Sequence, residues 1–127
     1  MSRRMSCSMT IEAVRDRTKT VTRRHVDTWK TLAVGDQLTL IEKGMGLPKG
    51  SKQVVLCEVE VTAVTIEPLS ALNPAECAAE GFPSYTPFEF AAMWMSGHGY
   101  ALPADEHSVN RISCRRIEWR YLPEVAE

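Results

Sequence analysis

A run of alternating apolar and polar residues near the middle of the chain most restricts how the chain folds. Across residues 57–63 apolar side chains alternate with polar ones, Cys57, Val59, Val61 and Ala63 against Glu58, Glu60 and Thr62. A period of two is typical of a strand with one buried face. Other signals predict strands at about residues 20–22, 37–43 and 108–122. Because few helices separate these strands, we expect a small closed or nearly closed β-barrel.

Three short helices are predicted from the residues at their ends. The first covers residues 8–17, with Ser8 as its cap. The other two begin with a capping residue and a proline and stop at a glycine, from Asn73-Pro74 to Gly81 and from Thr86-Pro87 to Gly97. Phe90, Met93 and Trp94 share one helical face. Residues 44–52 and 100–107 are expected to be loops. The fold class expected is therefore mixed α/β (α+β).

Length and composition indicate one soluble domain that spans residues 1–127. The chain has 127 residues, 44% hydrophobic and 24% charged, which is ordinary for a globular protein. Its longest apolar runs, such as residues 54–56, are too short to cross a bilayer, and its N-terminal residues do not resemble a signal peptide. We therefore expect a cytoplasmic location and no membrane partner.

The net charge of −1 conceals an asymmetry along the chain. Residues 1–30 hold eight Lys/Arg and three Asp/Glu, whereas residues 67–106 hold six Asp/Glu and no Lys/Arg. A basic segment of this kind favours an anionic partner such as RNA. Alternatively, the two segments neutralise one another in the fold.

The cysteines and histidines do not predict a metal site. The four cysteines form no C-x-x-C pair, and the three histidines are scattered along the sequence. In a reducing compartment such cysteines are typically free thiols. We expect neither a metal nor a cofactor.

The stretch "DRTKTVTRR", residues 16–24, carries the candidate chemistry. A lysine with a lowered pKa can take the proton of a threonine hydroxyl, and the nearby Arg17, Arg23 and Arg24 supply charge that lowers it. In a regular strand Lys19 and Thr22 would point to opposite faces. They converge only if the chain turns or bulges there, or if Lys19 still belongs to the end of the preceding helix. An exposed basic strand is the alternative interpretation.

Two further residues complete the candidate site. Glu80, at the end of a predicted helix, is a candidate for proton transfer or for orienting the lysine. Its alternative is an exposed helix-end carboxylate. Trp94 is a candidate for stacking on a base, and its alternative is core packing.

The arrangement resembles the ASCH domain family, which has a PUA-like β-barrel fold. The resemblance is carried by "TIEAVRDRTKTVTRR" (10–24), "LAVGDQLTLIEKGMGL" (32–47), "AAEGFP" (78–83), "TPFEFAAMW" (86–94) and "RRIEWRYL" (115–122). It implies a small PUA-like β-barrel with short peripheral helices. The loop "EKGMGLPKG" is most similar to small phage and prophage members.

The resemblance also implies a function. Some small ASCH proteins are metal-independent amidohydrolases that remove the acetyl group of N4-acetylcytidine. By resemblance Lys19, Thr22 and Glu80 match their catalytic residues, and Arg24 matches a substrate-binding arginine; we add Arg17, Arg23 and Trp94 as candidate substrate contacts. The departures are Arg17 at a glycine position, Thr18 at an arginine position, Arg23 at an apolar position and a longer loop at 44–52.

Three classes of function follow from these observations. The leading hypothesis is an amidohydrolase that acts on an acylated cytidine or related nucleoside. The alternatives are a non-catalytic RNA-binding module or a ribonuclease, and, for a phage-encoded protein, a binder of a host protein through residues 44–52.

Overall fold

The computed structural model describes residues 3–43, 49–101 and 106–123. In chain order its elements are β1 (Arg3–Ser6), α1 (Ile11–Arg15), β2 (Val21–His25), β3 (Gln37–Ile41), β4 (Val55–Pro68), the 3₁₀ helix η1 (Leu69–Ala71), α2 (Pro74–Ala79), α3 (Pro87–Gly97), the 3₁₀ helix η2 (Glu106–Arg111) and β5 (Ser113–Tyr121). The expected mixed α/β class is confirmed. Most of the predicted loop at 44–52 lies outside the described residues.

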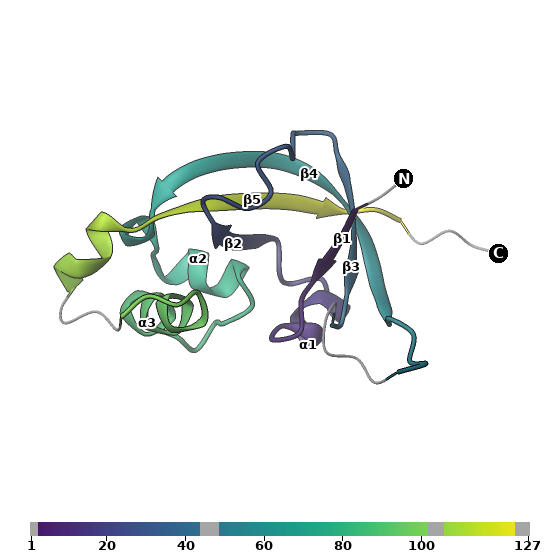
Figure 1. The fold of residues 1–127 in the computed structure, drawn as a ribbon, viewed down its shortest axis with the longest axis horizontal. Helices are drawn as coiled ribbons and strands as arrows, with labels where there is room; N and C mark the ends of the chain where they lie inside the picture. Colours follow the sequence, from purple (N-terminus) through teal and green to yellow (C-terminus); the bar gives the residue numbers. More distant parts are fainter. Residues whose placement is uncertain (1–2, 44–48, 102–105, 124–127) are drawn as a thin grey trace.

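The five strands form one curled sheet in the order β1-β3-β4-β5-β2. Strand β1 runs parallel to β3, and the other neighbours are antiparallel. Figure 1 shows β4 and β5 arching over α2 and α3. The curvature that the sequence predicts is present, but the sheet is a half-barrel, because β1 and β2 form its two edges.

Strand β4 carries the alternation that the sequence predicts. Val59 and Val61 are buried, whereas Glu58 is exposed and Glu60 is only half-buried. The register against β5 shifts between Val61 and Ala63, which marks a bulge at the end of the alternating run. The long β4 can therefore bend and pair with both β3 and β5.

Some element boundaries differ from the sequence-based prediction. Helix α1 is shorter, with Thr10 rather than Ser8 at its N-cap position. Residues 108–111 belong to η2 rather than to the last strand. Strand β1 was not predicted, because "RRMS" has no strand signal of its own and extends by pairing with β3.

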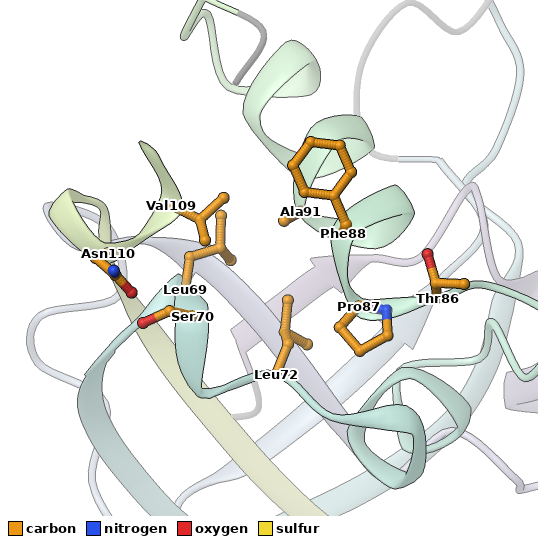
Figure 2. Close-up of a pocket in the computed structure, with 9 residues that line it drawn as sticks. All are labelled: Leu69, Ser70, Leu72, Thr86, Pro87, Phe88, Ala91, Val109 and Asn110. Atoms are coloured by element: carbon orange, nitrogen blue, oxygen red, sulfur yellow. The ribbon is translucent and has the colours of Figure 1, made fainter. Parts of the chain in front are cut away.

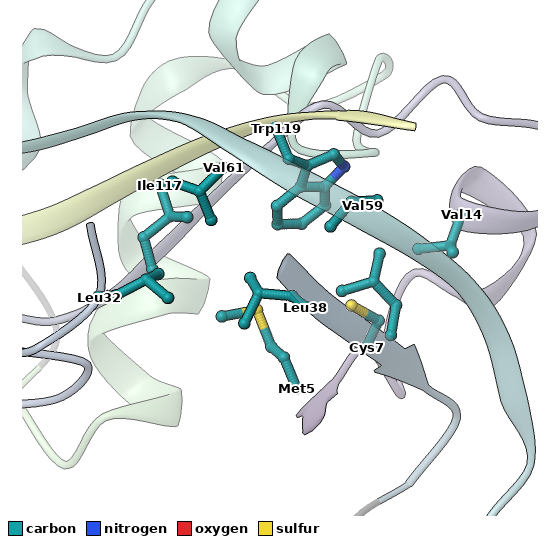
Figure 3. Close-up of a cluster of buried hydrophobic side chains, with 10 residues drawn as sticks. Met5, Cys7, Val14, Leu32, Leu38, Val59, Val61, Ile117 and Trp119 are labelled. Carbon is teal, nitrogen blue, oxygen red and sulfur yellow. The ribbon is translucent and has the colours of Figure 1, made fainter. Parts of the chain in front are cut away.

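The buried hydrophobic residues form two clusters. The first lies inside the curl and joins β1, β3, β4 and β5 (Figure 3), with Met5, Leu38, Val59, Ile117 and Trp119 among its buried members. The second joins η1, α2, α3, η2 and β5 through Leu69, Cys77, Phe90, Trp94 and Cys114. Helix α3 is fixed at its start by a capping box between Thr86 and Glu89. No helix among the described residues is long and apolar enough to cross a membrane.

Candidate functional site

The segment before β2 turns sharply, and this turn decides where Lys19 lies. After α1, Arg17 adopts a left-handed backbone conformation with φ 64°. The backbone amides of Thr18 and Lys19 then both donate to the carbonyl of Ala13, and Thr20 donates to Ala79. Lys19 therefore precedes the regular strand, so the odd spacing between Lys19 and Thr22 does not force their side chains apart.

The last strand fixes this segment from the other side. The carbonyl oxygen of Lys19 accepts a hydrogen bond from Trp119 Nε1 at 3.0 Å. The hydroxyl of Tyr121 donates to the same oxygen. Two buried or half-buried aromatic donors on β5 thus determine the position of the lysine backbone.

Lys19, Thr22 and Glu80 line one cavity of about 240 Å³. The cavity lies where β1 and β2, the two edges of the sheet, approach each other beside α3. Its polar side includes Cys7, Thr10 and Arg24, and its apolar side is formed by Phe82, Phe90, Met93 and Trp94. The convergence expected from the sequence is present; the catalytic roles stay predictions.

The Lys19 ammonium is buried against the end of α2. Its Nζ donates to the Glu80 carbonyl at 2.6 Å and to Glu80 Oε1 at 3.3 Å, and only 4% of either side chain is exposed. Burial lowers the pKa of Lys19; the Glu80 carboxylate and Cys7 oppose this, and the charge of Arg24 adds to the lowering. Such a lysine is easier to deprotonate than a surface lysine.

The turn after Glu80 brings the start of α1 against the end of α2. The next residue, Gly81, has φ +100°, a conformation that side chains disfavour. A Cβ atom there would come within 3.0 Å of Thr10 Cγ2 and 3.1 Å of Ala13 Cβ. Gly81 therefore allows the close approach of α1 and its N-cap residue to this turn.

Arg23 is the most enclosed cation of the site. Its side chain is 0% exposed and contacts three carboxylates: Glu80 Oε2 at 3.0 Å, Glu67 Oε1 at 2.8 Å and Glu76 Oε1 at 2.7 Å. Burial opposes the charge, but the carboxylates outweigh it and the pKa of Arg23 is raised. The basic and acidic segments of the sequence therefore neutralise one another in part.

Arg24 connects the two edges of the sheet. Its guanidinium donates to the carbonyl of Ser6 in β1 at 2.7 Å, and its Nε donates to Thr22 Oγ1 at 3.4 Å. Burial lowers the pKa of Arg24, while Cys7 and Glu80 act in the opposite direction. Of the predicted arginines, this one lies next to the candidate nucleophile.

Of the remaining candidate substrate contacts, Trp94 lines the cavity but also packs in the core, and Arg17 lies outside the cavity. Trp94 Nε1 donates to the carbonyl of Arg23 at 2.9 Å, and its ring stacks on His98 with centroids 3.9 Å apart. The Trp94 side chain therefore both lines the cavity and packs in the second hydrophobic cluster, and the His98 ring covers part of the indole face. Arg17 does not belong to the cavity lining; its guanidinium lies 5.5 Å from the ring centroid of Tyr121.

Several lining residues could not be singled out from the sequence. Cys7 and Thr10 precede or begin α1, and Phe82 follows the Gly81 turn. Their places in the lining depend on contacts between separate elements, which no local pattern shows. The "EGFP" turn after a short helix was the one available signal for this junction.

A larger hollow lies on the other side of α3. It has a volume of about 620 Å³ and is lined by Leu69, Ser70, Leu72, Thr86, Pro87, Phe88, Ala91, Val109 and Asn110 (Figure 2). None of these side chains is charged. This groove lacks groups that perform acid–base chemistry, so the smaller cavity is the candidate site.

The described part of the chain contains no cluster of three or more His, Cys, Asp or Glu side chains arranged to bind a metal ion. The four cysteines are free, and three of them are buried.

Comparison with known proteins shows the fold and no more. No family model and no curated protein matches the chain. Among solved structures, protein EF3133 from Enterococcus faecalis V583, described with the family model DUF984, is similar with a TM-score of 0.66. The match has 15% identity and covers 96% of this chain and 80% of that chain.

Proposed function

We propose that the protein is an ASCH-type amidohydrolase that hydrolyses an acylated cytidine or a related nucleoside. The observation that carries the proposal is the buried Lys19 ammonium, which shares a cavity with the Thr22 hydroxyl and the Glu80 carboxylate. A lysine is seldom buried without a function or a full set of partners, because desolvation of its charge is costly. The resemblance to the amidohydrolases supplies the reaction.

The first half of the reaction forms an ester on the enzyme. Neutral Lys19 takes the proton of Thr22 as Oγ1 attacks the acyl carbon, which gives a tetrahedral intermediate. The proton that Lys19 has taken then passes to the Glu80 carboxylate, to which the ammonium is already hydrogen-bonded. As the C–N bond breaks, Glu80 transfers this proton to the leaving cytosine amine, and the acyl group stays on Thr22.

The second half restores the enzyme. Water loses a proton to Lys19 or Glu80 as it attacks the Thr22 ester, and the carboxylic acid leaves as Thr22 recovers its hydroxyl. The net reaction consumes one water and yields an amine and an acid. Arg24, whose Nε contacts Thr22 Oγ1, is suited to stabilise the negative charge that develops beside this oxygen.

The cavity is suited to a small, flat substrate. Its volume of about 240 Å³ lies below the roughly 300–1,000 Å³ typical of pockets for drug-sized ligands. It would accommodate the base and its acyl group, with the sugar toward the opening. The wall made by Phe82, Phe90 and Trp94 provides an apolar surface for the base.

The basic segment supports a general RNA-binding module less well than the enzyme. Two of its cations, Lys19 and Arg23, are buried and paired with carboxylates. Others have protein partners, since Arg4 donates to Gln53 and Arg15 contacts Glu12 and Glu42. Less positive charge is therefore available for phosphate than the sequence suggests.

Incubation of the purified protein with N4-acetylcytidine tests the proposal. We expect release of cytidine and acetate, which chromatography measures. Thr22→Val, which removes the hydroxyl at nearly constant volume, should abolish release, and Thr28→Val provides a matched control at an exposed threonine. Absence of cytidine release with N4-acetylated, N4-formylated and N4-propionylated substrates would refute the proposal.

A further inference from the structure

The carboxylate of Glu80 is divided between two buried cations. Its Oε1 accepts from Lys19 Nζ at 3.3 Å, and its Oε2 accepts from Arg23 at 3.0 Å. The shorter contact is the one to Arg23. Arg23 therefore acts on the same carboxylate as Lys19, since it binds Oε2 while the lysine binds Oε1.

Arg23 also connects Glu80 to charges outside the cavity. Glu67 and Glu76, its other two partners, are not cavity-lining residues. Glu76 in turn accepts two hydrogen bonds from Arg116, at 2.6 and 3.1 Å. Arg23 is thus held from behind by a network on β4, α2 and β5, which fixes the point from which it contacts Glu80.

The sharing of the Glu80 carboxylate between two cations affects how readily Lys19 loses its proton. A carboxylate that paired with Lys19 alone would stabilise the ammonium and oppose proton loss. A cation on the other carboxylate oxygen weakens that stabilisation, because it draws the negative charge of the carboxylate away from the lysine. Arginine suits this role, because it stays protonated under all conditions relevant to proteins.

We propose that Arg23 is a positioning residue that orients Glu80 and keeps Lys19 ready to act as a base. This inference rests on the proposed function and deepens it. Arg23 is a candidate substrate contact by its place in the sequence, but in the structure three carboxylates already engage its guanidinium.

The groups that face Lys19 come from several elements. They are Glu80 at the end of α2, Cys7 after β1 and Arg24 on β2, with the Tyr121 hydroxyl of β5 on the backbone carbonyl. Cys7 and Arg24 remain in place when Arg23 is changed. An altered titration of Lys19 in an Arg23 variant would therefore report on the shared carboxylate.

Titration of Lys19 without substrate is the decisive measurement. Side-chain NMR of labelled lysine, with Lys19 assigned through Lys19→Met, gives the pKa in the wild type and in Arg23→Met. We expect the variant to raise the pKa by about one unit or more. The pH–rate profile for N4-acetylcytidine should move to higher pH by the same amount, so that turnover at neutral pH falls about tenfold.

Two controls isolate the effect. Arg116→Met removes another arginine of the same network that does not contact Glu80, and should change the pKa of Lys19 much less than Arg23→Met does. Arg23→Lys keeps the cation and should give a pKa between those of the wild type and Arg23→Met. A purely structural role for Arg23 would change stability in these variants without this ordered series of pKa values.

Glu80→Gln keeps the inference testable if Arg23→Met does not fold. Removal of the carboxylate should lower the pKa of Lys19, opposite in direction to the arginine variant. An unchanged or raised pKa in Glu80→Gln, or an unchanged or lowered pKa in folded Arg23→Met, would overturn the inference. Because the titration needs no turnover, lack of activity would refute the proposed function alone.

Discussion

The two hollows on either side of α3 differ in kind rather than in degree. The groove beside η1 and η2 is the larger, about 620 Å³ against about 240 Å³, yet none of its lining side chains is charged. The smaller cavity contains Lys19, Arg23, Arg24 and Glu80 in its lining. Volume alone would select the wrong hollow, whereas buried ionisable groups identify where chemistry is possible.

One helix supplies both walls. Phe90, Met93 and Trp94, which the sequence places on one helical face, line the small cavity, whereas Pro87, Phe88 and Ala91 line the groove. The helix therefore separates a charged compartment from an uncharged one. Variants on its two faces, and on the charges behind them, should give different results.

The largest effect is expected for Lys19→Met. Loss of the base should reduce turnover by roughly 10²–10⁴-fold. The free energy of unfolding should stay similar, because an apolar side chain replaces a buried ammonium and Glu80 keeps its contact with Arg23. Turnover assays and urea denaturation measure the two quantities.

Lys30→Met is the matched control, since the side chain of Lys30 is 63% exposed. It should leave both quantities unchanged. Retained turnover in Lys19→Met would remove the functional distinction between the two hollows.

Truncation of the two aromatic residues near the start of α3 should lower the unfolding free energy by different amounts on the two faces of the helix. Phe90→Ala should cost about 3–5 kcal/mol of unfolding free energy, because Phe90 is fully buried. Phe88→Ala should cost roughly half of that or less, because Phe88 is only half-buried at the groove. Equal losses, measured by urea denaturation, would show that the groove is packed as tightly as the core.

The ion pairs of Glu76 with Arg23 and Arg116, behind the small cavity, should make the free energy of unfolding depend on pH in the acid range. Hydrogen bonds from Arg116 and Arg23 lower the pKa of Glu76 from 4.5 to about 2. The resulting stability is present above about pH 4.5 and is lost as the pH falls toward 2, on the order of 3 kcal/mol in total. Denaturation at a series of pH values measures this loss.

Glu76→Gln should flatten that pH dependence and lower the stability at neutral pH. Glu12→Gln is the matched control, because the Glu12 side chain is 84% exposed, and it should keep the dependence of the wild type. A wild-type slope that survives in Glu76→Gln would place the acid sensitivity elsewhere.

The smallest effect is expected at the helix cap beside the groove. Thr86→Ala removes the side-chain acceptor for the Glu89 amide and should cost about 1 kcal/mol. Thr86→Ser keeps the oxygen and should be nearly neutral. Turnover should not change in either variant; a clear loss in Thr86→Ala with normal stability would link the groove to catalysis.

Local patterns predict the parts of this fold that depend on local chemistry. The caps at Asn73 and Thr86 and the alternation in β4 each act within a few residues, and the structure has them where the sequence indicates. Strand β1 and the 3₁₀ helix η2 were missed because their conformations depend on partners far along the chain.

The candidate site shows the same division. Lys19, Thr22 and Glu80 were brought together by resemblance, and the turn at Arg17 that permits it has no signature in "DRTK". The role of Arg23 was not predicted, because the alternation rule allows only one buried face for a strand. In β2 three successive residues, Val21, Thr22 and Arg23, are buried, since packed elements cover both faces.

The contacts of Trp119 and Tyr121 with the Lys19 carbonyl have a consequence for the order of assembly. Lys19 is synthesised well before the donors that fix it, which lie on β5 about one hundred positions later in the chain. Strand β2 likewise has β5 as its sheet neighbour. Such long-range contacts slow folding. A nascent chain released before Tyr121 would contain every proposed catalytic side chain and still lack the arrangement that they need.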